Sequence, residues 1–288
     1  MTLSIRWLTV VVCVGLTTFS ASAEADVLLL DAAADTSLYE VPVGQPETAN
    51  SSGEHLFAGR IASGERRPTL FRFNLSAIPA GATITSTQLS LSLTRNPPGV
   101  LPPVNFSLFP VTASWGEGSS DAGSPGGNGV AATTGDPTWT QRAFPASAWS
   151  TAGGDFSATA SAVTAASGLA RYQWGSTATM VSVVQSWLDT PSGNFGWVLI
   201  ADEAAGNLTA RRFASREAAD ITTRPQLRVE FTPLGGGPQP AFPASIPSLS
   251  WFGRFTLLVL VAGFASWKLR IRAASRLRAF GAGTRCRA

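Results

Sequence analysis

This chain of 288 residues has two cysteines, and both lie near its ends. Cys13 falls in the first 23 residues and Cys286 in the last three. The central part can therefore form neither a disulfide framework nor a thiolate metal site. We expect it to fold without oxidant, since about 200 residues can bury a core of their own.

Histidine is scarcer still, because His55 is the only one. No serine or acid motif lies near it, so a Ser-His-Asp triad would have to be assembled by the fold alone. A histidine zinc site is also disfavoured, because it needs further nitrogen or sulfur ligands. We therefore expect His55 to be structural.

Two pairs of acidic residues keep an enzymatic alternative open, because two facing carboxylates suffice for glycoside hydrolysis. They are Asp202 with Glu203, just after a predicted strand, and Glu117 with Asp121, in a Gly-rich segment. Solvated loop acids are the interpretation that we favour, so no catalytic residue is predicted.

No EF-hand spacing is present, and no cofactor is expected. Ca²⁺ remains an option through the carboxylate oxygens of Asp31, Asp35 and Glu217.

Positive charge is sparse in the centre of the chain and concentrated at its ends. The formal net charge is +3, but the part between Glu24 and Ser250 holds 12 basic and 18 acidic residues, a formal charge of −6. Nucleic acid is therefore not an expected partner of this central part.

The two ends have the pattern of export signals. Residues 1–23 combine Arg6, an apolar run and Ala21-Ser22-Ala23, which is typical of a signal peptide cleaved after Ala23. The apolar run at residues 255–267, extended back to Leu249, has about the 20 residues that a transmembrane helix needs. The basic tail at residues 273–288 then stays in the cytoplasm by the positive-inside rule. Residues 234–245 form a Gly/Pro-rich spacer.

Between these ends, residues 24–233 alternate as half-buried strands do. Leu89, Leu91 and Leu93 share one face of the segment 83–94, and Leu227 and Val229 do the same further on. Other candidate strands are residues 27–31, 55–60, 69–74, 104–111, 196–201 and 209–215. Only residues 181–188 have a helical period, whereas residues 116–135 and 153–168 are predicted loops. The pattern predicts an all-β fold, a jelly-roll-like antiparallel β-sandwich with one short helix.

Several short motifs occur in a specific order along this domain. They are LFRFNLSAIPAGATI at 70–84, SWGEG at 114–118, PTW at 137–139, GGDF at 153–156, VQSWL at 184–188, NFG at 194–196, FASRE at 213–217 and RPQL at 224–227. Together they resemble the DNRLRE-domain family, which is related to disaggregatase repeats and to a carbohydrate-binding module family. The resemblance covers nearly all of residues 26–232. It implies a mainly non-catalytic β-sandwich, appended to enzymes or displayed at surfaces.

The segment Ile246-Pro247-Ser248-Leu249-Ser250, with the following apolar run and arginine cluster, resembles an IPTL-CTERM sorting signal over residues 246–272. Ser248 stands where the family usually has threonine, and Arg254 interrupts the run. The resemblance implies a Gram-negative type of bacterium. Its inner membrane would hold the protein through the C-terminal helix until a sorting protease releases it to the cell surface or the medium.

Tryptophan and arginine supply the candidate ligand-binding residues. Trp115, Trp139 and Trp149 lie beside the Gly-rich segments and, with Arg212, would suit a polysaccharide, a uronic-acid polymer above all. Indole faces stack on the C–H faces of sugars, and arginine forks to carboxylates. The alternative is that each tryptophan is core, which we favour for Trp187 and Trp197.

Arg216 and Glu217 come at the end of a predicted strand, where they can hold down a loop. We expect Arg216 to have a carboxylate or carbonyl partner and a structural role.

These observations predict an exported, non-catalytic surface or extracellular-matrix module that binds polysaccharide or another matrix component. Two alternatives remain open: a purely structural matrix or adhesion protein, and a polysaccharide hydrolase or lyase.

The predicted export signals can be tested by mass. We expect a membrane-bound precursor and a mature form shortened at both ends, beginning near Glu24 and ending within residues 246–250, because an extended spacer is open to a protease. Cell fractionation followed by intact-mass measurement checks this. A chain that keeps its whole tail in the inner membrane would rule out the sorting hypothesis.

Overall fold

The computed structural model describes residues 25–99 and 102–234. The predicted signal peptide (1–23), sorting signal (246–272) and basic tail (273–288) lie outside these residues, as does all of the spacer but its first residue. Within the described ranges, no helix is long and apolar enough to cross a membrane.

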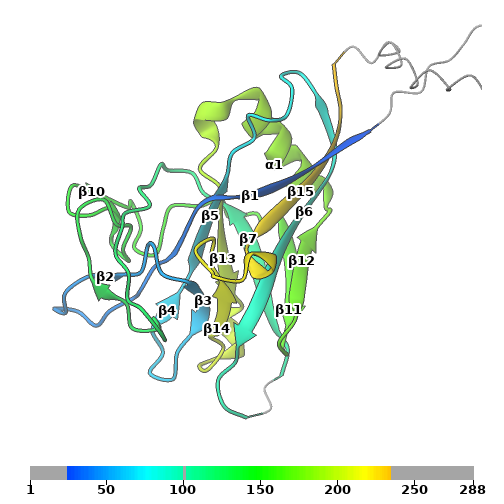
Figure 1. The fold of residues 1–288 in the computed structure, drawn as a ribbon. Helices are drawn as coiled ribbons and strands as arrows, with labels where there is room; N and C mark the ends of the chain where they lie inside the picture. The colour runs from blue at the N-terminus through cyan, green and yellow to red at the C-terminus, as the bar shows by residue number, and fades with distance from the viewer. Residues whose placement is uncertain (1–24, 100–101, 235–288) are drawn as a thin grey trace, which may run out of the picture. The chain divides into compact units, whose positions relative to one another are not determined.

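The domain consists almost entirely of antiparallel strands (Figure 1). The main strands are β1 (Asp26–Ser37), β3 (His55–Arg60), β5 (Thr69–Phe73), β6 (Thr83–Arg95), β7 (Val104–Pro110), β11 (Ala162–Ala166), β12 (Arg171–Gly175), β13 (Trp197–Ala201), β14 (Arg211–Ala214) and β15 (Gln226–Thr232). Short pairs complete it: β2 (Thr48–Ala49) with β8 (Val130–Ala131), β9 (Gln141–Ala143) with β10 (Ser147–Ala148), and β4 (Arg66–Arg67) with β3.

Strand β1 belongs to both layers of the fold. Asp26–Asp31 pair with β15, whereas Ala32–Ser37 pair with β5, with a register irregularity between Ala32 and Ala34. One layer continues from β15 to β6 and β12, and the other from β5 to β13, β7 and β11. Bulges commonly bend a strand so that it can serve two layers. The predicted all-β, antiparallel architecture is thereby confirmed.

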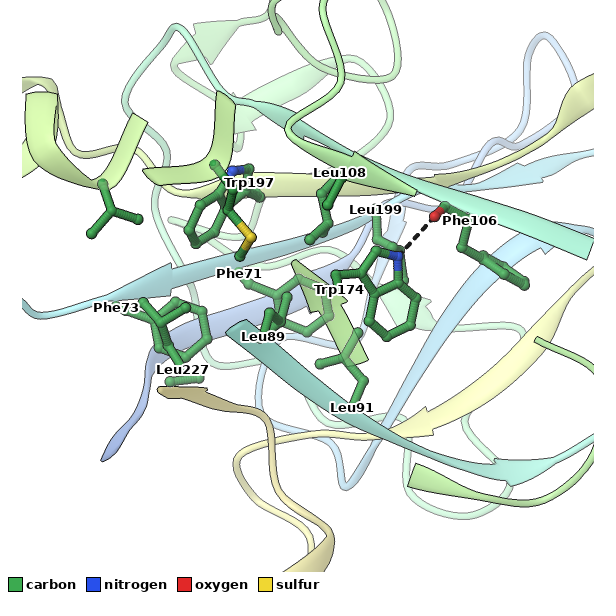
Figure 2. Close-up of a cluster of buried hydrophobic side chains, with 14 of the residues drawn as sticks. Phe71, Phe73, Leu89, Leu91, Phe106, Leu108, Trp174, Trp197, Leu199 and Leu227 are labelled. Carbon is green, nitrogen blue, oxygen red and sulfur yellow. Dashed lines mark hydrogen bonds between the residues drawn. The ribbon is translucent and has the colours of Figure 1, made fainter. Parts of the chain in front are cut away.

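The hydrophobic core lies between these layers (Figure 2). Leu89 and Leu227 face it from one layer, and Phe71 and Phe106 from the other. Both layers alternate as the sequence predicts, because every second side chain of a strand points to the same side. The buried indole of Trp174 donates from Nε1 to the carbonyl of Phe106 at 2.7 Å, which satisfies its one polar group.

Helix α1 (Ala178–Asp189) packs against β6 near one end of the core. The Oγ1 atom of Thr177 accepts from the Met180 amide at 3.0 Å, which caps the first turn. Trp187 is buried, with its ring 4.4 Å from that of Trp197. The helical period and the expected core position of Trp187 are both confirmed.

One predicted loop contains a strand. Residues 153–168 include β11, which pairs with β7 and turns its small residues Ala162 and Ala166 to the core. Alanine has low strand propensity, so the segment gave no strand signal, and only its tertiary partner makes it one. The other predicted loop, residues 116–135, has regular structure only at β8.

The core makes a direct stability prediction. Leu89→Ala should lower the free energy of unfolding by about 2–5 kcal/mol, because Leu89 is fully buried between the layers. Leu169→Ala is the matched control: Leu169 is 66% exposed, so its loss should cost under about 0.5 kcal/mol. Urea unfolding of both variants measures the difference, and equal costs would contradict the packing described above.

Candidate functional site

The three candidate tryptophans are packed in a second hydrophobic cluster. Their exposed fractions are 4% for Trp115, 8% for Trp139 and 6% for Trp149. They cover the outer face of β5 and β13, where Leu70 and Val198 point away from the main core. This corrects their expected role as exposed stacking platforms, because a ring this buried offers no free face to a sugar.

Hydrogen bonds from the indole nitrogens of Trp115 and Trp149 hold these two side chains in place. The indole Nε1 of Trp115 donates to the Phe195 carbonyl at 2.8 Å, and that of Trp149 donates to the Thr138 carbonyl at 3.0 Å. With their polar groups satisfied inside the protein, these two tryptophans serve the fold.

Trp139 borders a surface depression, here named the Trp139 cleft. Its main lining residues are Arg60, Arg66, Trp139, Gly153, Phe156 and Glu203, and its volume is about 70 Å³. The Arg66 guanidinium lies 4.6 Å from the centre of the Trp139 ring and so covers one face of it.

Ion pairs hold the arginines of the cleft. Arg66 contacts Glu40 at 2.9 Å and Glu203 at 3.5 Å, and Arg60 contacts Glu203 at 2.9 Å. Burial opposes ionisation of Glu40, but hydrogen bonds from the Arg66 side chain and amide lower its pKa overall. Charged groups thus surround a shallow hollow, whose volume of about 70 Å³ has room for a small chemical group only.

Phe156 is an aromatic side chain of this cleft that sequence reasoning missed. It is 38% exposed, and its ring lies 5.6 Å from that of Phe109. Gly153 has φ +93° and leaves no room for a Cβ atom, which would lie 2.7 Å from the Trp139 ring. The GGDF motif was the available signal, because its glycine is what lets the segment close over Trp139.

Arg212 lies in a different depression, here named the Arg212 groove. Phe57, Arg95, Pro97, Pro98, Asn128 and Arg212 are among its lining residues, and its volume is about 380 Å³. No residue lines both the groove and the Trp139 cleft. The structure therefore does not bring Arg212 together with the tryptophans.

The candidate catalytic acids all have other partners. Glu203 binds two arginines, while Asp202 accepts from the amide of Ala204 and caps a short 3₁₀ turn. Asp121 accepts from the amide of Gly123 two residues on. Each of these three acids therefore makes a structural contact within the fold.

Arg216 joins three parts of the chain. Its Nε and Nη2 atoms contact the two carboxylate oxygens of Glu117 at 2.7 and 3.0 Å, and Nε also lies 2.8 Å from Glu217. Its amide donates to Asp35 at 2.8 Å, and the Asp35 amide donates to Glu117 at 3.0 Å. Arg216 thus has the carboxylate partner that we expected, and it ties the segment after Trp115 to β1.

The arrangement around Arg216 perturbs two acids. Burial raises the pKa of Asp35 well above its usual value, and the charge of Glu217 adds to the effect. Burial likewise raises the pKa of Glu217, against the opposing charge of Arg216. One carboxylate oxygen of Asp35, Oδ1, has no hydrogen-bond partner among the described residues.

The proposed calcium ligands do not form a site. Asp31 accepts from the side-chain Nε2 atom of Gln226 at 3.4 Å, whereas Asp35 and Glu217 lie beside Arg216. Across residues 25–99 and 102–234, no group of three or more His, Cys, Asp or Glu side chains is arranged to hold a metal ion.

Comparison with known proteins adds no relative: a scan against protein-family models finds no match for the chain, and a search of curated proteins finds none either.

The pKa of Asp35 predicts the pH dependence of stability. An acid whose pKa is raised in the folded state favours folding at low pH and loses that contribution as pH rises from about 4 through the folded pKa. Asp35→Asn should remove this loss, so its free energy of unfolding relative to wild type should rise with pH. The slope is at most about 1.4 kcal/mol per pH unit.

Urea unfolding of wild type and Asp35→Asn between pH 4 and pH 9 measures this difference. Ser76→Asn, a substitution at an exposed loop position, is the control, and its free energy of unfolding should follow that of wild type at every pH. Parallel stability curves for wild type and Asp35→Asn would show that Asp35 does not titrate as described.

Proposed function

We propose that this chain is an exported, non-catalytic surface or matrix module that binds polysaccharide through the Trp139 cleft. The observation that carries the proposal is the placement of Phe156 beside Arg60, Arg66 and Glu203. Binding sites for sugars combine an apolar face with a few convergent polar groups, and this cleft has both.

In the proposed complex, a sugar ring lies on the exposed face of Phe156. Its hydroxyl groups donate to Glu203 and accept from Arg60, two residues that form an ion pair with each other at 2.9 Å. The hollow of about 70 Å³ receives one ring substituent, so most of the ligand stays at the surface. Such a site suits one unit of a long polymer.

The absence of catalysis is part of the proposal. His55 is half-buried, and burial together with the charge of Arg212 lowers its pKa. Each candidate carboxylate is engaged by an arginine or by a backbone amide. These roles favour a binding module over a hydrolase or lyase.

Family and location belong to the same proposal. The motif order supports a jelly-roll-like member of the DNRLRE-domain family, and the ends support export with an IPTL-CTERM-like sorting signal. Partners would then be a polysaccharide or matrix component, the inner membrane and a sorting protease.

The cleft can be tested by substitution at Phe156. Phe156→Ala should weaken binding to a polysaccharide identified on a glycan array by about tenfold, because the stacking surface is lost. Leu169→Ala removes an exposed apolar side chain elsewhere and should leave affinity unchanged. Affinity electrophoresis in gels that contain the polysaccharide reports both.

A second comparison uses matched arginines. Arg60→Gln should weaken binding, whereas Arg228→Gln should not, although Arg228 is also paired, with Glu230. A chain that binds nothing on the array would favour the structural-protein alternative instead.

A further inference from the structure

Two arginines face each other across neighbouring strands at the Arg212 groove. Arg212 on β14 and Arg95 on β6 are direct Cα partners in the antiparallel ladder, and both line the groove. Directly opposite residues of such a ladder project from the same face, where like charges are destabilising. The fold therefore places two cations together at a cost.

No acid offsets that charge within the described residues. The groove has no Asp or Glu in its lining there, and neither Arg95 nor Arg212 forms an ion pair with a described residue. Arg212 donates from Nε to the hydroxyl of Thr94 at 3.1 Å. Burial, and then the charge of Arg95, lower the pKa of Arg212.

Arg211 precedes Arg212 on β14, and neighbouring residues of a strand point to opposite sides. Arg211 also lines the groove, is buried, and donates to the carbonyls of Leu208 and Ala210 rather than to a carboxylate. Its Nε atom is buried with no partner among the described residues. The acid next to His55 is Glu54, which is exposed and forms no ion pair with a described arginine.

The contrast with other arginines of the domain is informative. Arg60 and Arg66 are likewise direct Cα partners across β3 and β4, but Glu203 contacts both of them. The Arg95–Arg212 pair has no such shared acid among the described residues, although the domain carries a formal charge of −6.

We infer that the Arg212 groove is an oxyanion-binding site, in which Arg95 and Arg212 together hold a sulfate, phosphate or carboxylate group. One bound anion between the two guanidinium groups turns their repulsion into two charge-assisted contacts. The volume of about 380 Å³ leaves space for part of the molecule that carries the anion, against the apolar surface of Phe57 and Pro97.

This site is separate from the Trp139 cleft, so it does not rest on the proposed function. If both sites act, an anionic polymer and a sugar surface are bound by different residues. If no anion binds at the Arg212 groove, the proposed function of the Trp139 cleft still stands, and the reverse also holds.

The test uses the full chain, purified in a non-ionic detergent, and its Arg95→Gln/Arg212→Gln variant. The matched control is Arg171→Gln/Arg228→Gln, which removes the same charge from two residues that do not line the groove; Arg171 donates to Ser92, and Arg228 contacts Glu230. All three proteins keep the same basic tail, so differences between them report on the groove.

Two measurements are made on each protein. Thermal unfolding is followed in sodium sulfate and in sodium chloride of equal ionic strength, with sodium phosphate as a third salt. Calorimetric titration then uses dextran sulfate, polygalacturonate and uncharged dextran, which separate a sulfate ester from a carboxylate as the source of the anion.

We expect the groove variant to lose the specific stabilisation by sulfate or phosphate and to bind at least one anionic polymer about tenfold to a hundredfold more weakly than wild type. The control should retain both properties. At low ionic strength without anion, the groove variant should melt at the same temperature as wild type or higher, because the repulsion is gone. Binding equal to that of wild type, or an equal loss in the control, would overturn the inference.

The single variant Arg95→Gln guards against a folding defect, because Arg95 is exposed. It should fold and lose most of the anion response. A folded Arg95→Gln chain with an unchanged response to every anion would also overturn the site.

Discussion

The fork between Arg216 and Glu117 is the contact on which the rest of this domain depends. It joins the end of β14 to the segment that follows Trp115, and Asp35 of β1 accepts from the amide of Arg216. In a protein with suitably placed cysteines, a disulfide bond could join such distant segments. Here charge-assisted hydrogen bonds do so, and Asp35 lies fully buried beside them, where burial raises its pKa. Asp136 supports the same segment by accepting from the amides of Ser119 and Ser120.

That anchoring explains why the tryptophans are not a binding surface. Once the segment after β7 is held down, its indoles meet the apolar outer face of β5 and β13 and bury it as a second core. Exposed aromatic surface is left at Phe156, which lines the Trp139 cleft and gives the proposed sugar site its apolar face. A tryptophan in a Gly-rich segment can therefore serve to attach that segment to the sheet as well as to bind a ligand.

Arginine has two separate uses in this domain. At Arg66 and Arg216 it is neutralised by carboxylates and holds loops in place. At Arg95 and Arg212 it is gathered without acids, in a domain whose overall charge is negative. A local concentration of cations against the net charge is an electrostatic cost, and an anionic ligand is the simplest compensation for it. Binding through both depressions would make the module responsive to sugar shape and to sugar charge independently.

The sequence by itself determined the fold class and most of the elements, because strand alternation at Leu89 or Leu227 and the helical period before Pro191 are local patterns. It also indicated that Arg216 would hold a loop. The tertiary structure alone decided that Ala162–Ala166 form a strand, that three tryptophans are core, and that Phe156 rather than Trp115 reaches a cleft. It alone placed Arg95 opposite Arg212. Each of these depends on which distant strand lies alongside, and strand register is set by pairing across the fold rather than by neighbours along the chain.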